Sequence, residues 1–231
     1  MKEKQENTFL NLILNIILPN LILIKGGDYW PESSPIWANV ALALSFPLSY
    51  GIYDFITRKK YNFFSILGFI SVLLTGGFAI SDLNPIWFAI KEAAIPLIFG
   101  IAVLASMFTK YPLVKVLLFN KSIIEVEKVY QSLTSKGNAE KFGKLLNFCS
   151  YLLSFSFLLS AILNFGLARY LVNSPAGTET RTKEIGEMGL YSWPIIMVPM
   201  MVISGIALYK LISGITRMSG LTMEEIIKQR K

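Results

Sequence analysis

The chain contains no histidine and only one cysteine, Cys149, among its 231 residues. Without histidine it lacks the usual metal ligand and the general base of hydrolase triads, and a lone cysteine cannot close an internal disulfide. It also has no glycine-rich phosphate loop, paired catalytic carboxylates or metal-spacing motif. These absences exclude disulfide scaffolds and most hydrolase chemistry. We therefore expect a protein that is not an enzyme and holds no metal or cofactor.

Charged residues are scarce, at 16% of the chain, whereas hydrophobic residues make up 53%. Soluble domains carry about 25% charged residues, so this balance predicts a membrane protein. The net charge of +7 resides in short stretches between apolar runs instead of a patch interleaved with exposed aromatic residues. That pattern argues against nucleic acid and favours the anionic inner leaflet of a membrane as partner.

Apolar runs of suitable length predict an all-α, polytopic bundle that forms one integral membrane domain over residues 1–231. A helix needs about 20 residues to cross a hydrocarbon core of about 30 Å. Lys2 and Lys4 precede the first run as in a signal peptide, but no small-residue cleavage site follows, so we expect a retained span. Six stretches meet or approach the required length, at 9–24, 36–57, 63–81, 85–108, 146–172 and 193–213.

The positions of lysine and arginine predict the orientation, because cytoplasmic loops retain positive charge. Most of the 22 basic residues fall on one side. The same side holds both chain ends, which predicts an N-in, C-in protein of the bacterial cytoplasmic (inner) membrane. Tryptophan, which prefers the headgroup level, falls at the predicted outer ends. The inner basic residues are Lys2, Lys4, Arg58, Lys59, Lys60, Lys110, Lys115, Lys121, Lys128, Lys136, Lys141, Lys144, Lys210, Arg217, Lys228, Arg230 and Lys231, and the tryptophans are Trp30, Trp37, Trp87 and Trp193.

The longest connection, residues 109–145, carries its own helical pattern. Pro112 to Phe119 could form a short helix, and residues 135–139 are typical of a turn. An apolar face opposite Glu125 and Glu127 predicts an amphipathic cytoplasmic hairpin between the fourth and fifth spans. Two interpretations stay open, a solvated connection or a segment that binds the membrane surface or a partner. The face comprises Ile123, Ile124, Val126, Val129, Tyr130 and Leu133.

Lys91 and Glu92 are ionisable residues inside the fourth predicted span, where an unpaired charge costs several kcal/mol. Asn84 and Pro85 suit the start of that helix, which places Glu92 about 10 Å from its outer end. We expect Lys91 to snorkel toward the surface. Neighbouring residues point about 100° apart on a helix, so the sequence predicts that Lys91 and Glu92 do not neutralise one another.

Arg169, near the outer end of the fifth span, lies at a depth similar to that of Lys91 and Glu92, with Asn164 somewhat deeper. Together with Asp82 these residues form a candidate binding or coupling cluster in the outer leaflet. Either the cluster is a functional site, or its charges are a structural pair that fixes helix packing. In the first span, Asn15 and Asn20 flank Pro19 and are predicted either to hydrogen-bond backbone groups that the proline leaves free or to bond across helices.

Four segments of the sequence carry a resemblance to known proteins: YGIYDFITRKK at 50–60, LNPIWFAIKEAAIPLIFGIAVLAS at 83–106, YPLVKVLL at 111–118 and LSAILNFGLARYLV at 159–172. They resemble a group of bacterial six-helix inner-membrane proteins that are sometimes labelled transporters. Through Trp87, Lys91 and the pair Pro112 and Leu113, the chain is more distantly similar to the intracellular septation protein A family. That family comprises small inner-membrane proteins linked to envelope integrity and to the division and elongation machineries. An outer loop at 173–188 and the long inner loop depart from it.

The resemblance implies a non-enzymatic protein that supports cell-envelope or membrane-lipid homeostasis, with envelope-machinery proteins as partners. The charged cluster supports an alternative, a small secondary transporter or permease, which also allows a homodimer. A transporter requires a cavity beside Glu92 and Asn164, whereas a scaffold can have a closed, packed bundle. The two hypotheses therefore differ in what they expect next to Glu92.

Overall fold

The computed structural model describes residues 13–29, 31, 34–58, 63–81, 83–109, 112–119 and 124–227. Its regular elements in these ranges are helices, apart from one isolated antiparallel bridge between Ile124 and Ile227. Four helical stretches in the described ranges are long and apolar enough to cross a membrane, at 36–53, 85–106, 139–171 and 179–219. The predicted all-α class and the membrane-type helices are thereby confirmed.

The helices follow the predicted spans closely in the middle of the chain and differ at its ends. The predicted spans 9–24 and 63–81 correspond to helices at 13–25 and 63–80, which are not among the four stretches above. Residues 9–12 lie outside the described part. In chain order the elements are η1 (Ile13–Ile17), α2 (Leu18–Lys25), η2 (Gly26–Tyr29), α3 (Ile36–Arg58), α4 (Phe63–Ile80), α5 (Pro85–Ser106), α6 (Leu113–Leu117), α7 (Val126–Ser135), α8 (Ala139–Leu171), α9 (Glu179–Ser192), η3 (Trp193–Met197), α10 (Val198–Ser219) and α11 (Met223–Ile226).

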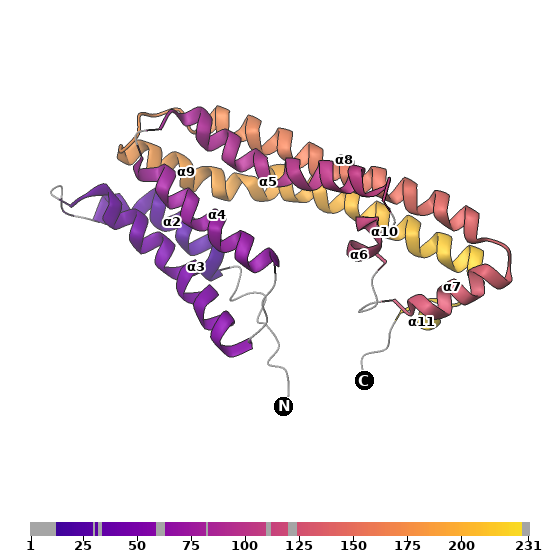
Figure 1. Ribbon diagram of the computed structural model, residues 1–231. Helices are drawn as coiled ribbons and strands as arrows, with labels where there is room; N and C mark the ends of the chain where they lie inside the picture. The colour runs from indigo at the N-terminus through magenta and orange to yellow at the C-terminus, as the bar shows by residue number, and fades with distance from the viewer. Residues whose placement is uncertain are drawn as a thin grey trace. The chain divides into compact units, whose positions relative to one another are not determined.

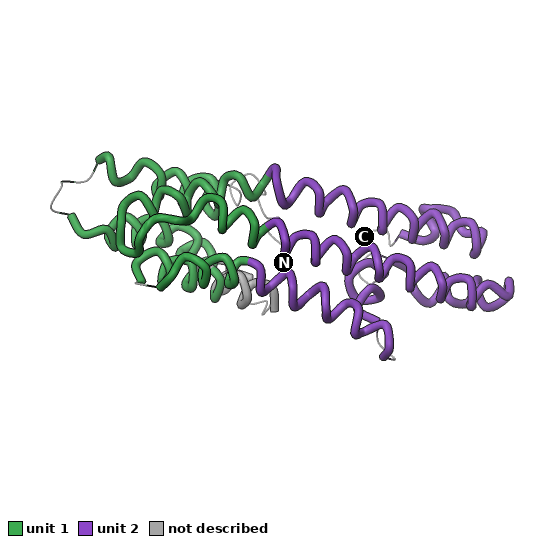
Figure 2. The backbone as a smooth tube through the Cα atoms, turned by 90° about the horizontal axis from the view of Figure 1, so that it is seen from above, with its two compact units in different colours: residues 1–92, 164–193 green, residues 93–163, 194–231 purple. Residues whose placement is uncertain are grey.

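The chain forms two compact units, coloured separately in Figure 2. Unit 1 comprises residues 1–92 and 164–193, and unit 2 comprises residues 93–163 and 194–231. Each unit has its own packing and is described by itself.

In unit 1, α2 packs against both α3 and α9, and α4 packs against α3 (Figure 1). Glycine makes the contact between α2 and α9 close. A Cβ built on Gly186 of α9 would lie 2.9 Å from the Asn20 carbonyl oxygen and 2.9 Å from the Cβ of Leu23. Gly189, one turn further along, faces the Asn20 side chain in the same way. Small residues at such positions allow two apolar helices to gain dispersion energy at short range.

The predicted outer loop at 173–188 is wrong over most of its length, because residues Glu179–Ser192 form α9. The side chain of Thr178 caps this helix by accepting a backbone hydrogen bond in its first turn. The polar composition of the segment concealed an apolar face, on which Ile185 and Met188 are buried. Burial of this face in unit 1 stabilises a helix that polarity alone does not suggest.

In unit 2, α6, α7 and α11 pack with parts of α8 and α10 around a common apolar core, which we call the terminal module. Of the apolar face predicted for the inner loop, Ile124, Val129 and Leu133 are buried in this core, and Val126 and Tyr130 pack against it. Ile123 lies outside the described residues. Helix α8 begins at Ala139, ahead of the predicted span at 146, and supplies the second arm of the predicted hairpin. The core comprises Val114, Phe119, Ile124, Val129, Leu133, Phe142, Leu146, Cys149, Leu211, Ile215 and Ile226.

Polar contacts join α7 to the segment that follows α10. The Ser132 hydroxyl donates to the Ser219 carbonyl oxygen at 2.8 Å, and the Lys128 ammonium lies 2.9 Å from the Glu225 carboxylate. The backbone N–H of Thr222 and then Lys128 lower the pKa of Glu225 below its usual value.

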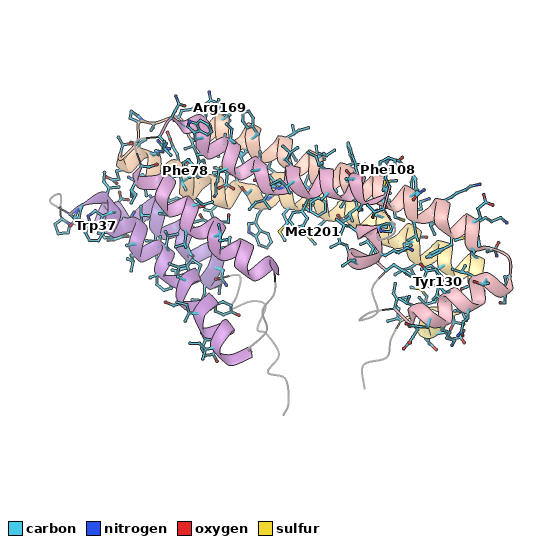
Figure 3. All side chains as sticks on the ribbon, viewed as in Figure 1. Trp37, Phe78, Phe108, Tyr130, Arg169 and Met201 are labelled. Carbon is cyan, nitrogen blue, oxygen red and sulfur yellow. The ribbon has the colours of Figure 1, made fainter. Side chains whose placement is uncertain are left out.

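Around Tyr130, labelled in Figure 3, rings pack edge to face at centroid distances of 5.6 Å to Phe119 and 5.7 Å to Phe142. The module is therefore held by aromatic packing inside and charge pairing outside.

Because α2 and α9 lie so close together, we predict that one added methyl group at their contact lowers the stability of the protein. Gly186→Ala should lower the free energy of unfolding by about 1–3 kcal/mol, because the new Cβ meets backbone and forces the helices apart. Gly166→Ala is the matched control, since nothing lies within 4 Å of its Cβ position, and it should leave stability unchanged or slightly higher. Thermal unfolding in detergent measures both. Equal melting temperatures for the two variants would contradict the close contact.

Candidate functional site

A cavity of about 180 Å³ lies within unit 1 among η1, α2, α3, α4, α5 and α9. One part of its wall is polar and consists of Asn15, Asn20, Thr75, Glu92 and Ser192. The rest is mainly apolar and includes Pro19, Leu23, Leu44, Pro47 and Phe88. Its volume is similar to that of an engineered cavity of about 150 Å³ that admits benzene, so a small molecule fits.

Proline explains why the helices around the cavity are irregular. Pro19 and Pro47 have no backbone N–H, so a carbonyl oxygen in the turn before each of them loses its helical hydrogen bond. The π-helical η1 lies immediately before α2. The Asn20 side chain donates to the Ile16 carbonyl oxygen at 2.8 Å, one turn earlier on the same irregular helix, so it bonds locally to backbone beside Pro19. Such interruptions place backbone and amide groups where a continuous apolar helix would offer none.

Lys91 and Glu92 form a direct ion pair, with 2.6 Å between Nζ and Oε1. The prediction that these neighbours cannot neutralise one another is therefore wrong, as is the prediction that Lys91 snorkels to the surface. The long, flexible lysine stem covers the 100° between the two positions. Nζ also donates to the Thr75 hydroxyl on α4 at 2.5 Å, so Lys91 has polar partners on two helices.

The surroundings of the pair account for its stability. The side chain of Lys91 is 8% exposed and that of Glu92 is 23% exposed. The Phe88 ring lies 5.4 Å from Nζ and adds a cation–π contact, while the Thr75 hydroxyl donates onward to the Ser71 carbonyl oxygen at 2.9 Å. The ammonium group of Lys91 thus contacts Glu92, Thr75 and Phe88, and Glu92 is one of the residues that line the cavity.

Asn164 and Arg169, two of the other predicted cluster residues, do not line the cavity. Asn164 is half-buried on α8, and Arg169 is exposed further along the same helix, as labelled in Figure 3. Neither belongs to the described residues that line the cavity. Asp82 lies outside the described residues. The structure thus brings together Lys91 and Glu92, and a joint role for all five residues stays a prediction.

Two cavity residues, Thr75 and Ser192, were not singled out from the sequence. Each is a single hydroxyl in an apolar stretch, where it usually bonds to its own helix, and both also do so here. Only the fold reveals that they line the same cavity as Glu92. A hydroxyl placed sixteen positions from Lys91 gives no periodic signal in the sequence.

Arg181 is another residue that the sequence did not reveal. It was assigned to an exposed loop, yet its side chain is fully buried on the first turn of α9. Its Nη1 donates to the Leu83 carbonyl oxygen at 2.9 Å, which fixes the start of α5 against α9. Its Nε and Nη2 have no hydrogen-bond partner in the described part of the chain. Glu184, on the next turn, accepts backbone hydrogen bonds from Asn173 and Ser174.

The chemical capacity of the cavity follows from its wall. Amide and carboxylate oxygens accept hydrogen bonds, while Phe88 and the prolines offer apolar contact. Among the described residues, no cluster of acidic, cysteine or histidine side chains could hold a metal ion. The arrangement suits binding of a small molecule with hydrogen-bond donors and one apolar side.

No protein-family model, curated protein or solved structure matches this chain.

The ion pair predicts a strong thermodynamic coupling between its two members. Lys91→Met and Glu92→Met should each lower the free energy of unfolding by about 2–4 kcal/mol, because each leaves a partly buried charge without its partner. The double variant should recover most of that loss. Melting temperatures of the three variants in detergent give the coupling, with Arg169→Met as an exposed control that changes little. Strictly additive losses would show that the two charges do not interact.

Proposed function

We propose that this chain is a bacterial cytoplasmic-membrane protein that crosses the membrane about six times, with both ends in the cytoplasm, and binds a small polar solute in the unit 1 cavity. It acts as a small secondary transporter or permease, without catalysis. The single observation that carries the proposal is the cavity beside the Lys91–Glu92 pair. Intramembrane charges beside proline-interrupted helices are typical of solute pathways.

The orientation is supported by the distribution of charged and aromatic side chains. Trp37 and Trp87 are exposed on the first turns of α3 and α5, as expected for residues at the headgroup level. The exposed, ion-paired Lys144 and Lys128 belong to unit 2, in the region predicted to face the anionic cytoplasmic leaflet. These features favour the N-in, C-in arrangement.

The substrate class follows from the polar wall. Glu92, Asn15 and Asn20 present oxygen atoms, and the Phe88 ring offers an apolar contact. A primary amide or an alkylammonium ion of a few heavy atoms matches these groups and the volume of about 180 Å³.

A second candidate is a scaffold that supports the cell envelope, similar to the septation protein A family. The terminal module favours it, because α7 buries its apolar face within the module and turns Glu127 and Lys128 outward. A folded module with a charged exterior suits envelope-machinery proteins as partners. A scaffold has no need of solute flux, which separates the two candidates.

Swelling of proteoliposomes in acetamide and in methylammonium chloride tests the solute proposal. Ser192→Phe should fill the cavity and reduce the swelling rate at least tenfold, whereas Ser45→Phe, the same change at an exposed position on α3, should leave it unaltered. Wild-type vesicles that swell no faster than protein-free vesicles in either solute would contradict the permease proposal and favour the scaffold.

A further inference from the structure

A groove of about 570 Å³ runs along one face of α10 in unit 2. Met223 of α11 also lines it, and α11 follows α10 directly in the chain (Figure 1). At Gly205 the groove is open, since nothing lies within 4 Å of its Cβ position. The α10 wall includes Gly205, Leu208, Tyr209, Ile212, Ser213 and Arg217.

The length of the groove matches one leaflet of a membrane. From position 205 to position 216 a helix rises about 16 Å, at 1.5 Å per residue. Half of a hydrocarbon core of about 30 Å is about 15 Å. Leu208 and Ile212 supply branched apolar surface along this distance, and the missing side chain at Gly205 leaves room for a chain to lie against the helix.

A single guanidinium group lies at one end of this apolar wall. Arg217 is exposed and forms no ion pair within the described part of the chain. Arginine binds phosphate through two parallel hydrogen bonds, so an exposed guanidinium beside an apolar groove is complementary to a phosphate ester with an attached acyl chain. Lys210 lies exposed on the same helix but does not line the groove.

We propose that this groove binds an anionic phospholipid of the cytoplasmic leaflet, with one acyl chain along Leu208 and Ile212 and the phosphate at Arg217. The inference rests on the membrane orientation proposed above and does not depend on the solute cavity of unit 1. The bound lipid gives the Arg217 charge a counter-ion and covers the open face of α10.

Native mass spectrometry of protein released from nanodiscs tests this site. The nanodiscs contain equal amounts of phosphatidylglycerol and phosphatidylcholine. Wild-type protein should retain a phosphatidylglycerol adduct. Arg217→Gln should lower the ratio of phosphatidylglycerol to phosphatidylcholine adducts about fivefold, because a cation in direct contact with the bound headgroup contributes about that factor and Arg217 is the cation that lines the groove. Lys210→Gln, which removes one charge from the same helix outside the groove, should leave the ratio unchanged.

A second variant tests the apolar part of the site. Gly205→Phe lies at an open position and should reduce both adducts by obstructing the acyl chain. Equal effects of Arg217→Gln and Lys210→Gln would overturn the proposal in favour of diffuse charge attraction. A protein dimer without lipid, abolished by Gly205→Phe, would overturn it in favour of a second copy of this chain in the groove. The lipid adducts are measured independently of solute flux, so failure of the proposed solute transport would not change this result.

Discussion

The pairing of Lys91 with Glu92 is the interaction on which the rest of unit 1 depends. Two charged side chains in the middle of an otherwise apolar helix are tolerated only if their charges are compensated. Thr75 supplies an oxygen for the lysine from α4, and Phe88 covers the ammonium group. The pair therefore couples α5 to α4 and sets the polar wall of the cavity.

Helix packing around the pair combines tight and loose contacts. At Gly186, α9 approaches α2 so closely that an added Cβ would meet the α2 backbone, and at Gly189 the Asn20 side chain occupies the space next to the glycine. At Pro19 and Pro47, the helices lose regular hydrogen bonds and a cavity remains. The same helices thus form a close helix–helix contact and an internal cavity. The proposed binding of a small solute requires both.

Apolar run length predicted the helices of the central part of the chain, because composition and length directly reflect the membrane as a solvent. Apolar run length did not predict α9, because its many polar residues are typical of a loop, although Ile185 and Met188 are buried. Lys91 and Glu92 were recognised as candidates, since charge in an apolar run is visible in the sequence. Their pairing was not, because the conformation of the lysine stem and its second contact with Thr75 on α4 are properties of the folded structure. Arg181 was missed for the same reason: its burial is a property of tertiary packing.

The proposed solute site requires that the cavity beside Glu92 admits water and lies on the outer side of the membrane. Cysteine labelling in intact cells tests it most directly, with the buried native Cys149 as an unreactive background. We predict that Ser192→Cys reacts with a small cationic methanethiosulfonate reagent, that Ala43→Cys, fully buried on α3, does not, and that Lys136→Cys reacts only after permeabilisation. An unreactive Ser192→Cys, or a Lys136→Cys that reacts in intact cells, would contradict the account.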